Sequence, residues 1–126
     1  MIGQLAVVAA GSTLGAWLRW GLSTWLNPRL PQLPLGTLAS NLIGGYLVGM
    51  AVGYFAANTA LAPEWRLLAI TGFLGGLTTF STFSAEVVQL LQADRLAAAA
   101  LLALVHLCGS LLLTALGFAT YRALAG

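Results

Sequence analysis

The chain has 126 residues, of which 60% are hydrophobic and only 6% are charged, and its formal net charge at pH 7 is +2. A soluble domain carries about 25% charged residues, so this composition excludes a water-soluble fold and predicts an integral membrane protein with a single transmembrane domain, residues 1–126. Two net charges do not indicate nucleic-acid binding, and one cysteine, Cys108, cannot form an intrachain disulfide.

Four stretches of the chain are long and apolar enough to cross a membrane as helices. A hydrocarbon core of about 30 Å takes roughly 20 helical residues, and the pattern predicts spans over residues 2–26, 35–57, 65–92 and 96–122. Prolines punctuate the loops after the first and second spans, where they end the helices. The N-terminus lacks the basic region of a signal peptide, so we expect the first span to be retained. The predicted fold class is therefore all-α, with four transmembrane helices.

The short loops carry almost the same positive charge on the two sides of the membrane. Four spans place Arg66 and Arg122 on one side, and Arg29 and Arg95 on the other. Positive residues in short loops normally set the orientation, so this balance predicts dual topology, in which the chain inserts in both directions. The natural assembly would be an antiparallel homodimer with its two-fold axis in the membrane plane. A dimer would also enclose a path for which four closely packed helices leave little room.

The first span places two glycines and one charge on a common face. Gly11, Gly15 and Arg19 follow one another at intervals of four. Arg19 lies between Trp17 and Trp20, which allows two interpretations. It could extend to the membrane surface, or its permanent positive charge could raise the anion concentration at a vestibule.

The second span repeats this interval with Asn41, Gly45, Gly49 and Gly53. Glycines at this spacing indicate close packing against another helix. Asn41 begins the same face, and two roles are open to it. Its side chain could join two helices by a hydrogen bond, or its amide could point into a polar cavity as a donor.

The third span contains a polar run that begins at Gly75 and Gly76. Five hydroxyl residues follow within seven positions: Thr78, Thr79, Ser81, Thr82 and Ser84. Polar groups at membrane depth are costly unless they pair or face a water-filled path. The two glycines permit unwinding, and Thr78 and Thr79 add β-branched stiffness, so we expect a helix break here. Carbonyl groups freed by a break suit a cation such as Na⁺, and freed N–H groups with the hydroxyls suit an anion.

Two phenylalanines, Phe80 and Phe83, lie within this polar run. They could be ordinary lipid-facing or core aromatics, but hydroxyl residues rather than leucines surround them. A phenyl edge is electropositive and can contact a small anion. Ser81 and Ser84 have the same spacing, offset by one residue, so donors and ring edges would lie side by side. This pattern favours an anion path.

In the fourth span, His106, Ser110 and Thr114 are four residues apart and form one polar line. A buried hydroxyl often bonds its own helix backbone, and a histidine can join two helices. Three polar residues in register favour a line along a transport path. The chain has no second histidine and no ligand spacing for a transition metal.

These residues resemble the Fluc fluoride channels, also called the camphor-resistance or CrcB family. The longest matching motif is GFLGGLTTFSTFSAE, residues 72–86. Further matches are GAWLRW at 15–20, GTLASNL at 36–42 and GSLLLT at 109–114. The similarity covers essentially the whole chain, and its central motif is long and specific.

The resemblance implies a passive fluoride channel of the bacterial inner membrane, which exports fluoride from the cytoplasm down its electrochemical gradient. It implies an antiparallel dual-topology dimer with two pores and no catalytic residues. Phe80 and Phe83 would supply ring edges along each pore, and Asn41 would donate at the vestibule end, near Arg19. The implied polar residues of the pore are Ser81, Thr82, Ser84, Ser110 and Thr114, and the role of His106 stays open.

The resemblance also implies a structural Na⁺ on the dimer axis. Backbone carbonyls of Gly75 and Thr78 from each subunit would hold it. The ligands and partners implied for this chain are thus fluoride, Na⁺, a second copy of itself and membrane lipid.

Two other functions compete with a channel. A small four-helix exporter of cationic drugs needs a membrane carboxylate, and the only candidate is Glu86, beyond the polar run. We favour a structural role for Glu86, which could accept hydrogen bonds from Thr or Ser hydroxyls or lie near the headgroups, because the end of this span is expected to reach the membrane interface. A scaffold without transport would leave the register of Phe, Ser and Thr unexplained. Residue chemistry alone does not separate a channel from a fluoride/proton antiporter.

Overall fold

The computed structural model describes residues 1–126 and consists entirely of helices and short connections. Three spans are continuous: α1 (Ile2–Leu26), α2 (Leu35–Ala57) and α6 (Leu96–Ala125). A short 3-10 helix, η1 (Asn27–Arg29), follows α1. Four helices are long and apolar enough to cross a membrane. The prediction of an all-α, multi-pass membrane protein is confirmed.

The third span, Pro63–Gln92, is built from four successive pieces. These are α3 (Pro63–Arg66), the π-helix η2 (Leu67–Leu74), α4 (Gly75–Leu77) and α5 (Phe80–Gln92). Thr78 and Thr79 separate α4 from α5 and have extended backbones, with φ/ψ of −93°/154° and −152°/119°. We call these two residues the α4–α5 junction.

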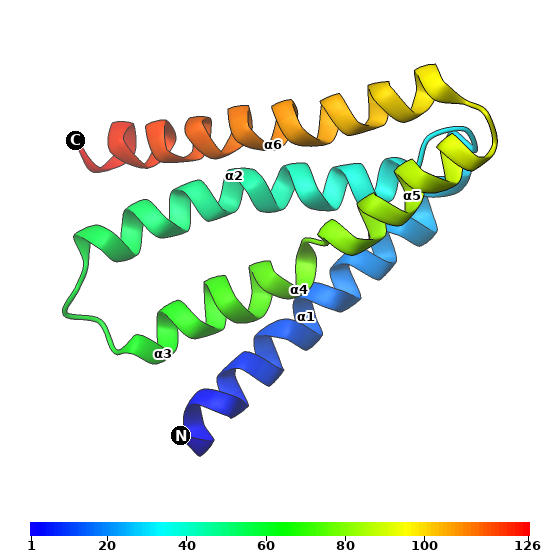
Figure 1. Ribbon diagram of the computed structural model, residues 1–126. Coiled ribbons are helices and arrows are strands. Elements are labelled where there is room, and N and C mark those ends of the chain that lie inside the picture. Colours follow the sequence, from blue (N-terminus) through cyan, green and yellow to red (C-terminus); the bar gives the residue numbers. More distant parts are fainter.

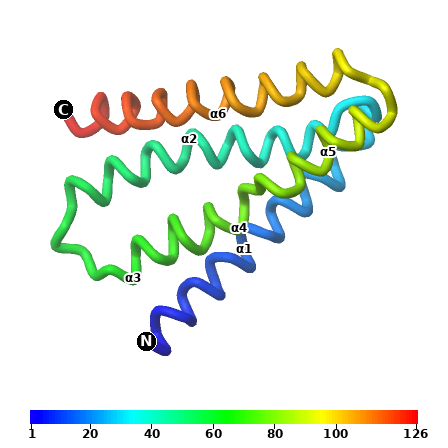
Figure 2. Tube along the Cα trace, viewed as in Figure 1, coloured from blue at the N-terminus to red at the C-terminus, as the bar shows by residue number.

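The four spans form two pairs that diverge from each other (Figure 1). α2 and α6 run side by side in opposite directions, and α1 packs along η2 and α4. Both chain ends and the α2–α3 connection lie at one end of the molecule, as the tube in Figure 2 also shows. The α1–α2 and α5–α6 connections lie together at the other end.

Glycines allow the helices within each pair to touch backbone to backbone. A Cβ at Gly49 of α2 would collide with the Thr114 carbonyl oxygen of α6, and a Cβ at Gly117 would collide with the Tyr46 carbonyl oxygen. In the other pair, a Cβ at Gly76 would collide with the carbonyl oxygen of Ser12. Close backbone approach of this kind is how membrane helices gain packing contacts without a hydrophobic driving force.

The expectation that Gly75 and Gly76 unwind the third span is wrong. Both are helical, and Gly75 has φ/ψ of −62°/−37°. The helix is interrupted two residues later, at Thr78 and Thr79. Gly76 instead serves the close contact with α1, for which any larger residue is too wide.

Most apolar side chains point outwards rather than into a core. Only 16 of the 126 residues are buried, and large leucines along α6 stay exposed. A soluble protein could not keep so much apolar surface in water. Lipid is the solvent that suits these faces, in agreement with the four spanning helices.

Candidate functional site

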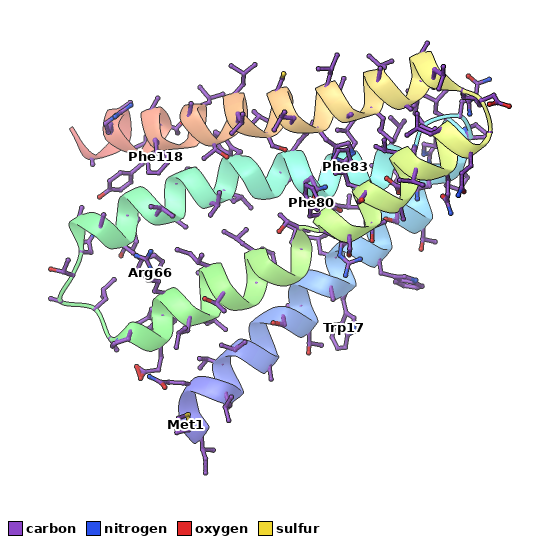
Figure 3. The ribbon with its side chains drawn as sticks, viewed as in Figure 1. Met1, Trp17, Arg66, Phe80, Phe83 and Phe118 are labelled. Carbon is purple, nitrogen blue, oxygen red and sulfur yellow. The ribbon has the colours of Figure 1, made fainter.

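A cavity of about 440 Å³ lies where α2, the α4–α5 junction and α6 meet. Its lining contains no charged side chain. Polar and aromatic groups gather there from elements far apart in the sequence: Asn41, Thr78, Thr79, Phe80, Phe83, His106 and Ser110. Figure 3 shows Phe80 and Phe83 side by side on α5, at this meeting point. Glycines of α2 and Gly75 complete the wall.

Asn41 holds the α4–α5 junction by replacing its missing backbone partners. The Thr79 N–H donates to Asn41 Oδ1 at 2.8 Å, and Asn41 Nδ2 donates to the Thr79 carbonyl at 3.0 Å. One side-chain amide therefore satisfies both polar groups of one peptide residue. Unpaired backbone groups at membrane depth each cost several kcal/mol. This pair of hydrogen bonds is therefore the main local reason that an extended segment can exist here.

The start of α5 is fixed by a side-chain cap. Thr79 Oγ1 accepts from the Thr82 N–H at 3.1 Å, which is the usual way that a threonine begins a helix. The Thr79 hydroxyl oxygen also lies 3.2 Å from that of Thr82 and 3.4 Å from that of Ser81. The N-terminal end of α5, which attracts negative charge, is thereby placed beside the cavity.

Arg19 reaches across from α1 to the third span. Its Nε donates to the Gly76 carbonyl at 3.1 Å. A positive charge near the carboxyl end of a helical segment complements the segment's dipole. The guanidinium is half-buried, so it stands next to the α4–α5 junction rather than only along α1.

The two phenyl rings differ in their surroundings. Their centroids are 5.6 Å apart and the planes meet edge to face, at 74°. Phe83 also stacks on His106, with 4.3 Å between centroids and 29° between planes. Phe80 is 79% exposed, so nothing within this chain covers it.

The polar residues of the fourth span face α2, and each of the three has different surroundings. His106 is buried, and its Nδ1 lies 3.2 Å from Asn41 Nδ2. Ser110 lines the cavity. Thr114 donates to the Gly45 carbonyl at 2.9 Å, so in this chain it joins α6 to α2.

The cavity collects only part of the residues that the sequence singles out. Residues outside its lining are Arg19, Gly49, Gly53, Ser81, Thr82, Ser84 and Thr114. Ser81 and Ser84 are exposed on α5, and Thr82 bonds to Thr79. Three glycines of the second span lie against α6. Gly45 lies against Ser110 and Thr114, Gly49 lies against Thr114, and Gly53 lies against Tyr121.

Sequence analysis missed two partners of the predicted residues. Thr79 was only one hydroxyl among five, yet it supplies the peptide that Asn41 holds. Thr37 donates to Glu86 Oε2 at 2.6 Å, in agreement with a structural role for this carboxylate. Thr37 stands one turn before Asn41 on the same face, and this spacing was the available signal.

Backbone oxygens are the metal ligands that the site offers, since no group of three or more acidic, His or Cys side chains is present. The Thr79 N–H turns to Asn41, so the Gly75 carbonyl loses its regular helical donor. The Thr78 carbonyl accepts no hydrogen bond. Gly75 is exposed and both residues line the cavity. Two carbonyls without their regular donors, both on residues of the cavity lining, suit a hard cation such as Na⁺.

Comparison with known proteins decides the family. The family model described as CrcB-like protein, Camphor Resistance (CrcB), matches residues 6–118. The chain belongs to the CrcB family. The resemblance inferred from the motifs is thus confirmed, and the CrcB match covers all four spans, leaving out only the outer ends of the first and last.

Curated relatives match this CrcB chain from end to end. A protein of Cupriavidus taiwanensis is 62% identical over 126 residues, which is 98% of this chain and 100% of the relative. One from Pseudomonas putida is 54% identical over 100% of this chain and 99% of its own. One from Nitrosospira multiformis is 58% identical over 96% and 94%. All three are named "Fluoride-specific ion channel FluC". Ion channels are not enzymes, so the prediction of a non-enzymatic protein is confirmed.

Proposed function

We propose that this chain is a fluoride-selective ion channel of the bacterial inner membrane, which lets fluoride leave the cytoplasm down its electrochemical gradient. The observation that carries this proposal is the uncharged cavity at the α4–α5 junction, where two phenyl rings stand beside the N-terminal end of α5. No carboxylate lines this cavity, so no formal negative charge there repels an anion. Full-length relatives named as fluoride-specific channels support the same ion.

The working unit of this proposal is an antiparallel dimer with two pores. A single chain leaves its cavity open, with Phe80 79% exposed and Gly75 uncovered on its wall. A second copy would close this side and bring aromatic residues from both chains to each path. The nearly equal positive charge of the loops supports insertion in both directions.

Within each pore, the residues would divide the work of replacing water around fluoride. Phe80 and Phe83 present ring edges, while Asn41 acts by holding the Thr79 peptide and Arg19 contributes positive charge near the vestibule. The hydroxyls of the proposed polar track are those of Ser81, Thr82, Ser84, Ser110 and Thr114. Exposed Ser81 and Ser84 would meet the path only when a second chain covers α5.

A structural Na⁺ would join the two chains on their axis. The carbonyls of Gly75 and Thr78 from each subunit would hold it, because both oxygens lack their usual donors. When bound, the cation supplies a positive charge that draws four carbonyl groups together across the interface. No step of fluoride movement is assigned to it.

The competing proton-coupled cation exporter is less well supported. Its carboxylate would have to meet the substrate, but Glu86 bonds Thr37 and does not line the cavity. A fluoride/proton antiporter remains the alternative for the same ion, and transport measurements separate the two.

Efflux from liposomes tests the proposal. Vesicles are loaded with potassium fluoride or potassium chloride, and valinomycin carries the compensating potassium. We expect rapid fluoride efflux, little chloride efflux, and no response to an imposed proton gradient at zero fluoride gradient. Protein-free vesicles provide the control. Equal chloride efflux, or no fluoride efflux, would overturn the channel, and fluoride uptake driven by protons alone would identify the antiporter.

A further inference from the structure

His106, the only histidine of the chain, makes two contacts with residues of the proposed pore. It is 4% exposed and belongs to α6, yet it touches both α2 and α5. Its Nδ1 lies 3.2 Å from Asn41 Nδ2, and its ring stacks on Phe83 at 4.3 Å.

The bonds of Asn41 decide which nitrogen of His106 carries the proton. Because the Thr79 N–H donates to Oδ1, the amide orientation is fixed, and Nδ2 is the atom that faces both the Thr79 carbonyl and the histidine. Nδ2 is only a donor. Nδ1 of the histidine must therefore accept, which leaves the hydrogen on Nε2 and the ring neutral.

The rest of the ring's surroundings agree with a neutral side chain. No charged residue shares the cavity lining with His106. Glu86 of α5 bonds Thr37, and Arg19 of α1 bonds Gly76. Nε2 is buried in the single chain and has no hydrogen-bond partner there.

We propose that His106 is a positioning residue of the pore, which acts through Asn41 and Phe83. This inference rests on the proposed channel function. The acceptor Nδ1 orients the Asn41 amide and, through it, the Thr79 peptide. The ring face fixes the Phe83 plane and so the direction in which its edge points. One neutral imidazole would thus align both the Thr79 peptide and the Phe83 ring along the same path.

Nitrogen NMR of the intact protein tests the protonation state without any transport. Because the chain has one histidine, ¹⁵N-histidine labelling gives only the two signals of His106. We expect an unprotonated Nδ1 and a protonated Nε2 at neutral pH. A protonated Nδ1, in either the other tautomer or the charged ring, would overturn the proposal. This result does not depend on whether the protein conducts fluoride, so it fails separately from the proposed function.

Three variants then separate the two contacts. His106→Gln keeps an acceptor and removes the stack, His106→Phe keeps the stack and removes the acceptor, and His106→Leu removes both. We expect each of the first two to lower fluoride efflux roughly tenfold, and the third to lower it further, with unchanged dimer elution. Cys108→Ser, at an exposed position of the same helix, is the matched control and should conduct normally.

The relative fluoride efflux of the three variants decides whether both contacts matter. If His106 acted only by stacking on Phe83, His106→Phe would conduct normally. If it acted only as a hydrogen-bond acceptor, His106→Gln would conduct normally. Either outcome in an assembled dimer overturns the proposal of a double contact. If a variant fails to assemble, the ¹⁵N measurement on the unmodified protein still accepts or rejects the acceptor role.

Discussion

At the scale of single residues, the site depends on side chains that supply hydrogen-bond partners to backbone groups. Asn41 supplies both partners of the Thr79 peptide, and Thr79 in turn caps α5. The sequence predicted Asn41, Phe80 and Phe83 as site residues, since an amide and two phenyls among hydroxyls are unusual in a membrane span. It could not predict that Asn41 grips Thr79, because that pairing joins residues 38 positions apart.

The phenyl pair gives a prediction at this scale. Phe80→Ile and Phe83→Ile should each lower fluoride efflux by roughly tenfold or more, because isoleucine has no electropositive edge. Phe80 is exposed in the single chain, so its replacement should leave the protomer's stability unchanged. Efflux is measured from liposomes and assembly by gel filtration.

Phe118→Ile provides the matched control, since this ring lies towards the other end of α6 (Figure 3). It should conduct as the unmodified protein does. Normal efflux from both Phe80→Ile and Phe83→Ile would remove ring edges from the pore.

At the scale of helices, hydropathy and length were sufficient to predict the spans, because a membrane leaves few other solutions. The interruption of the third span was expected within the polar run, and it lies at Thr78 and Thr79 rather than at the two glycines. Helix propensity marks Gly75 and Gly76 as weak points, but propensity is overridden when packing needs a residue without a side chain. Gly76 packs against the backbone of α1. Thr78 and Thr79 leave the helix because Asn41 hydrogen-bonds the backbone of Thr79 and the Thr79 side chain caps α5.

Close helix packing gives the second prediction. Gly49→Ala should destabilise the protein by about 1–3 kcal/mol, because the added Cβ collides with the Thr114 carbonyl and α2 must move away from α6. Thermal unfolding in detergent measures the loss.

Gly21→Ala is the control for this substitution. Gly21 is also helical, but a Cβ there meets nothing within 4 Å. It should be neutral or stabilise by up to about 1 kcal/mol, as helix propensity predicts. Equal unfolding temperatures for the two variants would contradict the packing argument.

At the scale of the whole molecule, the two helix pairs diverge (Figure 1), and the cavity-lining residues Phe80 and Gly75 are exposed in the single chain. The loop charges predicted an antiparallel pair, and the proposed dimer would cover the exposed Phe80 and Gly75. Neither partner geometry nor pore closure can be obtained from one chain, because both depend on contacts between copies.

The proposed interfacial Na⁺ gives the third prediction. Replacing Na⁺ by N-methylglucamine during purification should shift the protein from dimer to monomer and lower fluoride efflux, since the carbonyls of Gly75 and Thr78 would then face each other without a cation. Light scattering with gel filtration measures the mass. Replacing chloride by gluconate at constant Na⁺ is the control and should change nothing. A dimer that ignores the cation would remove Na⁺ from the interface.

An extended pair of residues inside a membrane helix would ordinarily be its loosest point. Here the Thr79 N–H and carbonyl are both held by a side chain of another helix, so the junction cannot open unless α2 and α5 separate. Its local fluctuations are therefore tied to the slow, cooperative opening of the bundle rather than to an independent hinge. The same amide that makes the kink possible also stiffens it. An ion passing this point would meet a preformed surface, and its rate would be set by the exchange of its water shell rather than by motion of the protein.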